Sequence, residues 1–235
     1  MKTLNVTPSL TEQVYRAIVD EILDGKLKPG QHMVQEQLAA TLGVSRQPIQ
    51  QALALLKSDG MVQEVGRRGL TVAQLDLSRM RCHYDIRGLL DGYAARSAAE
   101  GVNAGRIDVG TVRKQFDEIF RAGADAIERE SVRDQIRFDE GFHKLIYGMS
   151  DNTVLRDTVE PHWRYLRRVM AEVLMHAEPA TVVWEQHNAI ADAILAGKAD
   201  AADKLAEDHV KNAGHRLTTA LRRRDDHSKH ESSVA

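Results

Sequence analysis

The sequence predicts a mainly α-helical protein with one short β-hairpin near its N-terminus. Two observations carry that prediction. Apolar residues recur at three- and four-residue spacing through most of the chain, which is the period of a helix with one buried face. Only 5 prolines and 16 glycines interrupt the 235 residues, and the densest turn-forming stretches lie before residue 75.

The first 60 residues predict three helices. The first covers 10–23 and is followed by the turn Leu27-Lys28-Pro29-Gly30. A short second helix covers 35–42 and ends at Gly43. Ser45 is the predicted N-cap of the third helix, which ends at Gly60. The apolar positions expected on the inner faces of the first and third helices are Leu10, Val14, Ile18, Ile22, Ile49, Ala52, Leu53 and Leu56.

The next segment changes from helical to strand-like spacing. Residues 61–65 and 70–73 read as strands, and Gly66-Arg67-Arg68-Gly69 separates them, which predicts a β-hairpin with a basic tip. The linker Leu42-Gly43-Val44-Ser45 gives the two preceding helices the spacing of a helix-turn-helix. Together these elements predict a winged helix-turn-helix domain over residues 1–75.

After Asp76 the pattern stays helical. We expect an all-helical bundle of about six helices over 76–224, followed by a polar, flexible tail over 225–235. The expected helices cover residues 78–100, 106–122, 131–149, 152–175, 180–196 and 200–223.

Composition excludes several classes of protein. The single cysteine, Cys82, rules out an internal disulfide framework and suits a reducing cytoplasm. No apolar run approaches the roughly 20 residues that span a bilayer, and the N-terminus lacks the core of a signal peptide. We therefore expect a cytoplasmic protein with no membrane partner.

The third helix carries the side chains expected to read DNA. Its N-terminal end would enter the major groove, where Arg reads guanine and Gln reads adenine. Ser45, Arg46, Gln47 and Gln50 are the candidates there, while Arg67 and Arg68 on the wing would meet phosphates or the minor groove. The alternative is a small helical domain with a surface arginine and no DNA partner.

Net charge first argues against nucleic acid, because the chain carries −2 overall. Residues 1–75 hold eight basic and seven acidic residues, a net charge of +1, and the remainder carries −3. A DNA-contact surface must therefore arise from placement of a few charges rather than from an excess.

The N-terminal unit resembles the winged-helix domain of the GntR family of bacterial transcription regulators. The matching segments include Leu27-Lys28-Pro29-Gly30, Glu36-Gln37-Leu38-Ala39, Leu42-Gly43-Val44-Ser45-Arg46-Gln47-Pro48-Ile49, Asp59-Gly60-Met61-Val62 and Arg68-Gly69. The resemblance implies a homodimer that binds double-stranded DNA at a short palindromic operator. It also places Gly69, at the basic tip of the wing, among the DNA-binding residues. Gln50 stands where the family usually carries Arg, and Gln51 replaces a typical Glu.

Polar residues occupy apolar positions in the predicted bundle. Asp139 and His143 fall within the apolar arc of the helix over 131–149 and point the same way from successive turns. His187 and His209 lie in the apolar arcs of the last two helices, each 11 residues from residue 198 in the turn between them. An antiparallel hairpin of the two helices would place these histidines side by side. The four residues therefore predict a divalent metal site, with Zn as first choice and Ni, Mn or Fe as alternatives.

The same pattern resembles the metal-binding form of the FCD effector domain of the FadR subfamily, over residues 76 to about 222. Asp85-Ile86-Arg87-Gly88-Leu89-Leu90 is similar to that domain's first helix, whose Arg commonly faces the ligand. The resemblance implies that Arg87 pairs with a small carboxylate effector. Asp91 stands at the usual acidic position after the Leu pair. His162, on the inner arc of its helix, is a further candidate for the effector pocket.

The predicted function is that of a ligand-controlled regulator, a repressor, in which an organic acid binds beside the metal. One alternative keeps DNA binding but makes the metal purely structural, with no effector. A metalloenzyme is a third interpretation, since a His₃Asp site activates water when one position is open. Against the enzyme, the sequence offers no nucleophile motif, phosphate loop or positioned general base.

Overall fold

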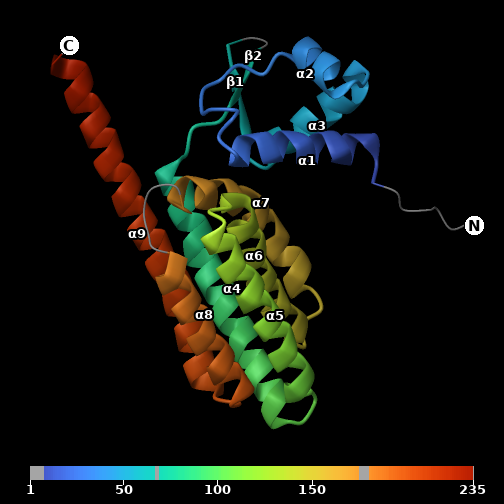
Figure 1. The fold of residues 1–235 in the computed structure, drawn as a ribbon, viewed down its shortest axis with the longest axis vertical. Coiled ribbons are helices and arrows are strands. Elements are labelled where there is room, and N and C mark those ends of the chain that lie inside the picture. The colour runs from blue at the N-terminus through green and yellow to red at the C-terminus, as the bar shows by residue number, and fades with distance from the viewer. Residues whose placement is uncertain (1–7, 67–68, 175–179, 235) are drawn as a thin grey trace, which may run out of the picture. The chain divides into compact units, whose positions relative to one another are not determined.

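A computed structural model describes residues 8–66, 69–174 and 180–234, with the helical residues 172–174, 180 and 220–234 described by backbone alone. Its internal contacts divide the chain into two compact units, Met1–Leu75 and Asp76–Ala235. Figure 1 shows the first unit as short helices with a hairpin and the second as a bundle of long helices. The mainly helical fold class is therefore confirmed.

The first unit follows the predicted order of elements. It contains α1 (Leu10–Leu23), α2 (Gln35–Leu42), α3 (Arg46–Ser58), β1 (Val62–Val65) and β2 (Gly69–Val72). The helix α2 ends at Gly43, whose φ of 65° is left-handed backbone that glycine adopts without strain. The two strands pair antiparallel with Val62 opposite Val72, which makes the predicted wing.

Packing of α1 on α3 forms the core of this unit. The buried residues include Val14, Ile18 and Ile22 on α1 and the whole predicted inner face of α3. Leu10, expected on the same face, is exposed at the start of α1. Ser45 occupies the predicted N-cap position of α3, but its side chain makes no cap hydrogen bond with any residue that the structure describes.

The second unit is a helical bundle. It contains α4 (Leu77–Asn103), α5 (Val109–Glu128), α6 (Val132–Met149), α7 (Leu155–Leu174), α8 (Ala180–Leu195) and α9 (Ala199–Val234). Asp76 starts α4 because its carboxylate accepts hydrogen bonds from the backbone N–H groups of Ser78 and Arg79. The helix α9 continues to Val234, beyond residue 223, where the last helix is expected to end.

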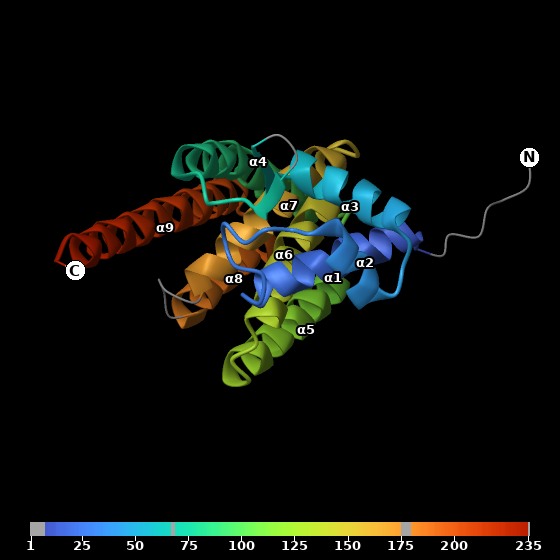
Figure 2. The same cartoon turned by 90° about the horizontal axis from the view of Figure 1, so that it is seen from above.

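The longest helix contact in this unit joins α4 to α9, which lie side by side (Figure 1 and Figure 2). Glycine makes that approach possible, because a Cβ at Gly214 would lie 2.7 Å from the Cβ of Tyr84. The core beside this pair includes Phe116, Phe142 and Trp163, each almost completely buried. The inner face of α6 thus packs into the apolar core of the bundle through Phe142 and Ile146.

Candidate metal centre and DNA-reading helix

Four buried side chains converge in the second unit. Asp139 and His143 lie on α6, His187 on α8 and His209 on α9, and one ligand atom of each lies within 4.8 Å of the others. His187 is fully excluded from solvent, and the other three are nearly so. The structure thus brings together all four residues that the sequence predicts as metal ligands.

Local structure explains this convergence. Asp139 and His143 are four residues apart, so successive turns of α6 carry them on one face. The turn between α8 and α9 contains Gly197 in left-handed backbone, and the resulting hairpin places His187 Nε2 3.2 Å from His209 Nε2. The same His187 atom lies 3.4 Å from Asp139 Oδ1.

These spacings fit a bound cation. Ligand atoms about 2.1 Å from a metal lie about 3.0 Å apart at right angles and about 3.4 Å apart in a tetrahedron. The two measured separations, 3.2 Å and 3.4 Å, fall within that range. His187, His209 and Asp139 thus stand at separations suited to a shared metal ion, while His143 Nε2 lies 4.0 Å from Asp139 Oδ2 and would move closer on binding.

Acceptor atoms outside the cluster lie beside Nδ1 of two of the imidazole rings. Gln186 Oε1 lies 2.7 Å from His209 Nδ1, and Asp91 Oδ2 lies 3.0 Å from His143 Nδ1. A proton on each Nδ1 leaves the lone pair of Nε2 for the centre of the cluster, as a metal ligand requires. Phe142 stacks on His187 with ring centroids 4.1 Å apart and limits its rotation.

Burial controls the charge of the cluster. It holds the pKa values of His143, His187 and His209 well below their usual range, so these imidazoles are neutral. Burial also raises the pKa of Asp139 to about 7, although the Arg87 charge opposes that shift. Among the described residues, Asp139 Oδ2 and His143 Nε2 have no hydrogen-bond partner. Neutral imidazoles and a buried carboxylate with unshared lone pairs are suitable ligands for a divalent cation.

Arg87 lies beside this cluster rather than on the surface. Its side chain is 3% exposed, and its guanidinium carbon lies 3.8 Å from the ring centroid of Trp163. Arg87 Nη2 is 3.2 Å from Asp91 Oδ2, yet Nε and Nη2 form no hydrogen bond with any described residue. A buried guanidinium with free donors can pair with the carboxylate of a small molecule.

His162 takes a different place from the other candidates. It is half-buried on α7, and its Nδ1 lies 2.9 Å from Nδ1 of His83, whose ring stacks on Tyr165. Burial lowers the pKa of His83 to about 4 and also lowers that of His162. The two neutral rings therefore share a hydrogen bond with each other, and a role for His162 in effector binding remains a prediction.

Glu140 follows Asp139 in sequence but belongs to a separate ion-pair network. Its carboxylate accepts two hydrogen bonds of 2.6 Å from Arg167 and lies 2.7 Å from Lys144 Nζ. The pKa of Glu140 falls because these cations outweigh the opposing effect of burial. Glu140 is therefore engaged across α6 and α7, and it is not oriented as a general base for a metal-bound water.

The DNA-reading candidates form an exposed face at the start of α3. Ser45, Arg46, Gln47 and Gln50 are all exposed, while Pro48 and Ile49 between them are buried. Arg46 Nη2 forms an ion pair of 3.0 Å with Glu36 on α2. Gly69 begins β2, where a Cβ would lie 2.7 Å from the carbonyl oxygen of Val65. Arg67 and Arg68 lie outside the described residues.

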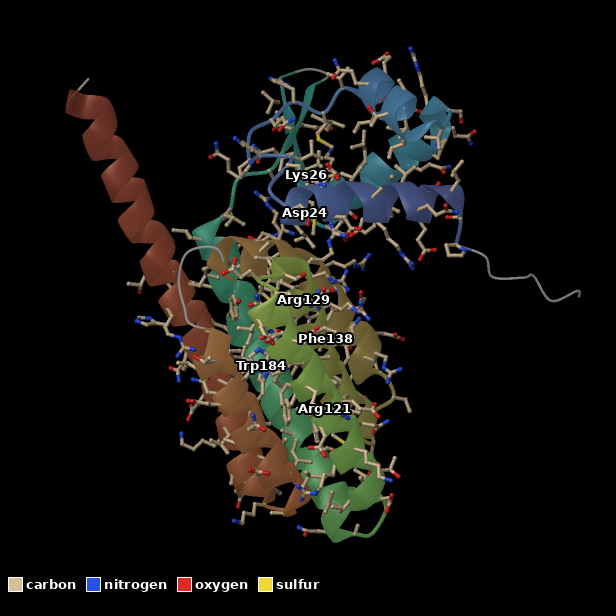
Figure 3. The ribbon with its side chains drawn as sticks, viewed as in Figure 1. Asp24, Lys26, Arg121, Arg129, Phe138 and Trp184 are labelled. Atoms are coloured by element: carbon tan, nitrogen blue, oxygen red, sulfur yellow. The ribbon has the colours of Figure 1, made fainter. Side chains whose placement is uncertain are left out.

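Several residues around the cluster carry no role in the sequence prediction. Tyr147 donates a hydrogen bond to Asp91 Oδ1, and Trp163 Nε1 lies 3.4 Å from the Tyr147 hydroxyl. Trp184, labelled on α8 in Figure 3, lies with its ring centroid 5.1 Å from that of His187. The contact of Asp91 with Arg87 could have been predicted from the sequence, because the two residues are one helical turn apart. The contact between Tyr147 and Trp163 depends on the packing of α7 on α6 and has no such signal.

Comparison with known families places each unit. Residues 10–72 match the family described as "Bacterial regulatory proteins, gntR family", and residues 83–212 match the FCD domain. The protein is thus a DNA-binding transcription regulator. The chain belongs to the gntR family of bacterial regulatory proteins and carries an FCD domain as its second unit.

Individual relatives agree with that family. The "HTH-type transcriptional repressor RspR" of Escherichia coli K12 is 26% identical over 208 residues, which cover 88% of this chain and 89% of the relative. The solved structure of E. coli McbR/YncC has a TM-score of 0.74 at 21% identity and covers 91% of this chain and 99% of its own. A GntR regulator from Rhodococcus sp. RHA1 has a TM-score of 0.72 at 20% identity, covering 89% and 98% of the two chains.

These comparisons also decide between regulator and enzyme. The curated relatives are named as HTH-type transcription regulators, which places this chain among regulators rather than enzymes. Among the helices that the structure describes, none has both the length and the apolar character needed to cross a membrane.

Proposed function

We propose that this chain is a homodimeric repressor of the FadR subfamily whose operator binding is controlled by a small organic acid held beside a divalent metal ion. One observation carries the proposal: a buried Asp–His₃ cluster lies next to a buried arginine that keeps free donors. A metal ion and a guanidinium in one enclosed site offer two points of attachment for a carboxylate.

The metal would be held by Asp139, His143, His187 and His209. Three nitrogen ligands and one oxygen ligand suit zinc first, with nickel, manganese and iron as alternatives. When bound, the ion supplies a positive charge that attracts and orients the effector carboxylate. Arg87 would take the other side of that carboxylate.

Charge balance supports an anionic effector. Arg87, Asp91 and Asp139 sum to −1 when all three are ionised and the histidines are neutral. A divalent ion would change this sum to +1. A net positive charge in a site shielded from water favours the entry of an anion.

DNA binding is assigned to α3, with two copies of the chain placed on a palindromic operator. Exposed apolar side chains on α4 support contact with a second copy: Ile86, Leu89 and Tyr93 are 47%, 62% and 45% exposed and share one side of the helix. The repressor role rests on the relative RspR, whose name describes it as a repressor.

Elemental analysis of the purified protein tests the metal site. We expect wild type and the control His215→Ala to hold a divalent metal, because His215 is an exposed histidine of α9 outside the cluster. His187→Ala should lose it. Metal content that is undiminished in His187→Ala would overturn the assignment.

A second measurement tests the effector and the oligomer. Thermal shift with malonate, succinate and citrate should show stabilisation in the metal-loaded protein that disappears on chelation and in Arg87→Met. Light scattering should give the mass of two chains.

A purely structural metal remains the second candidate, because four protein ligands can close a tetrahedral zinc site without an effector. That candidate predicts that the protein binds metal but that none of the three acids shifts its melting temperature. Binding of DNA that responds to a carboxylate would decide against it.

A further inference from the structure

One buried carboxylate connects the arginine to the metal cluster. Asp91 lies on α4, one turn after Arg87, with its side chain 2% exposed. Its Oδ1 accepts the hydrogen bond from the Tyr147 hydroxyl. Its Oδ2 lies 3.2 Å from Arg87 Nη2 and 3.0 Å from His143 Nδ1. A single oxygen atom therefore faces both the candidate effector residue and a candidate metal ligand.

The two donors compete for that oxygen. Neither contact has hydrogen-bond geometry, and Oδ2 has no hydrogen-bond partner among the described residues. Oδ1, by contrast, is held by Tyr147, which fixes the carboxylate while leaving Oδ2 between the two donors. A small rotation of the guanidinium or of the imidazole would commit Oδ2 to one of them.

We propose that Asp91 is a positioning residue shared by the two sites, so that drawing Arg87 away from Asp91 strengthens metal binding at His143. The proposal rests on the proposed function, since it takes the Asp–His₃ cluster as a metal site. An acceptor on Nδ1 fixes the imidazole tautomer and makes Nε2 a better metal ligand. Arg87 competes with His143 for that acceptor as long as its Nη2 lies 3.2 Å from the same oxygen.

This arrangement couples the effector to the metal. A carboxylate that pairs with Arg87 releases Oδ2 to His143, so the metal is held more tightly when the effector is present. By thermodynamic linkage, the metal must then tighten effector binding by the same factor. The site would respond to the two ligands together more strongly than to either one alone.

A direct charge effect is the competing explanation. Arg87 and the metal ion are both cations, so removing Arg87 could strengthen metal binding simply by removing repulsion. Repulsion acts whether or not residue 91 carries a carboxylate. Coupling through Asp91 requires that carboxylate, and a double-mutant cycle separates the two explanations.

The experiment uses Zn²⁺ alone as probe and measures its affinity by competition with a chromophoric chelator. Asp91→Asn should bind Zn²⁺ roughly 10–100-fold more weakly than wild type. Asp85→Asn is the matched control, since Asp85 is an exposed carboxylate on the same helix, and it should bind as wild type does. Arg87→Met should bind Zn²⁺ more tightly than wild type.

The cycle is completed by Arg87→Met combined with Asp91→Asn. We expect the gain from Arg87→Met to vanish when Asn stands at position 91. Persistence of the full gain would assign it to charge repulsion and overturn the proposal, as would an unchanged Zn²⁺ affinity in Asp91→Asn.

One further variant and one folding control complete the experiment. Asp91→Glu retains a carboxylate and should recover part of the affinity, which a merely structural role for position 91 would not predict. Tryptophan fluorescence of each variant checks that the second unit is folded. A wild-type protein that fails to bind Zn²⁺ would overturn the proposed metal site itself, whereas an additive cycle in a protein that binds Zn²⁺ overturns only the role of Asp91.

Discussion

The two units use the same pair of residue types in opposite surroundings. In the first unit Arg46 pairs with Glu36, and their side chains are 66% and 59% exposed. In the second unit Arg87 pairs with Asp91, and the corresponding values are 3% and 2%. Water screens the first pair, so it contributes little to stability. Removing one member of the second pair would leave a buried charge without compensation, which is costly.

In the first unit, the residues expected to bind DNA are therefore separate from those that stabilise the fold. In the second unit, the same buried residues serve both purposes. The first unit has an apolar core and exposes the candidate DNA-reading side chains of α3, so a change at the DNA face need not disturb the fold. The second unit holds its candidate ligand residues inside the bundle. A change there alters binding and stability together.

Acid should produce the largest effect, and it should act on the second unit. Histidines with depressed pKa values stay neutral in the folded protein, while the unfolded chain takes up their protons below about pH 6.5. The members of this group are His83, His143, His162, His187 and His209. Their contribution to stability is therefore fully present above pH 6.5 and decreases as the pH falls.

Two carboxyl groups act in the opposite direction. The pKa of Asp139, about 7, and the raised pKa of Asp91 let the folded state keep protons that the unfolded chain has released. Five histidines outnumber two carboxyls, so the unfolded state binds more protons between about pH 6.5 and 4. The metal-free protein should lose about 1.4 kcal/mol per pH unit for each net proton over that window.

Urea unfolding at pH 7 and pH 5 checks this prediction, with tryptophan fluorescence as the signal. Both tryptophans, Trp163 and Trp184, lie in the second unit, so the signal reports on that unit alone. Hydrogen exchange of α3 serves as the control, because His32 is the only histidine among residues 1–75 and is exposed. Equal urea midpoints at the two pH values would contradict the expected role of the buried histidines.

A smaller effect is expected from one methyl group at the contact of α4 with α9. In Gly214→Ala the new Cβ would meet the Cβ and Cγ of buried Tyr84 at 2.7 Å. We expect a loss of about 1–3 kcal/mol of stability, since a packed interior resists added volume. The tryptophan signal measures the shift in the urea midpoint.

Gly141→Ala provides a control of opposite sign. This glycine also lies within a helix, α6, but no described atom lies within 4 Å of a Cβ built there. Alanine should therefore raise stability by up to about 1 kcal/mol through its greater helix propensity. Equal losses in both variants would show that backbone conformation, and not the approach of α9, makes Gly214 necessary.

The same contrast between the units explains what the sequence could predict. The bounds of α1 and α2 agree with the expectation to the residue, because their apolar periods and the glycines that follow mark both helices locally. His143, His187 and His209 were found because polar residues stood at apolar positions. Asp91 received no role, since periodicity assigns a residue to a face but does not identify the atoms of other helices that meet it there.

Two other differences have separate physical causes. His162 lies on the inner arc of its helix, yet its partner is His83 on α4, and only the packing of α7 on α4 brings the two together. The final part of α9 has no apolar period from which a helix could be inferred, although the structure continues the helix to Val234. For His162, the packing of two helices and not the local pattern therefore decides the partner.

In the first unit, Arg46→Ala should weaken DNA binding without changing the fold. The side chain is exposed, so the free energy of unfolding should change by less than about 0.5 kcal/mol. Binding to DNA selected from a random pool by the wild-type protein should weaken by about 1–3 kcal/mol. Arg16→Ala, an exposed arginine on α1, is the control and should affect DNA binding little. A large loss of stability in Arg46→Ala would contradict the claim that the DNA-reading residues of the first unit are separate from those that stabilise its fold.

The smallest predicted effect concerns the acidic partner of Arg46. Glu36 holds the Arg46 guanidinium at 3.0 Å, so DNA must compete with this carboxylate for the same donors. Glu36→Gln should strengthen DNA binding by up to about fivefold, the range of an exposed ion pair. Glu21→Gln removes the same charge from α1, where Glu21 pairs with Lys26, labelled in Figure 3. If both variants strengthen binding equally, the cause is net charge; a gain confined to Glu36→Gln would show that the protein restrains Arg46 before DNA arrives.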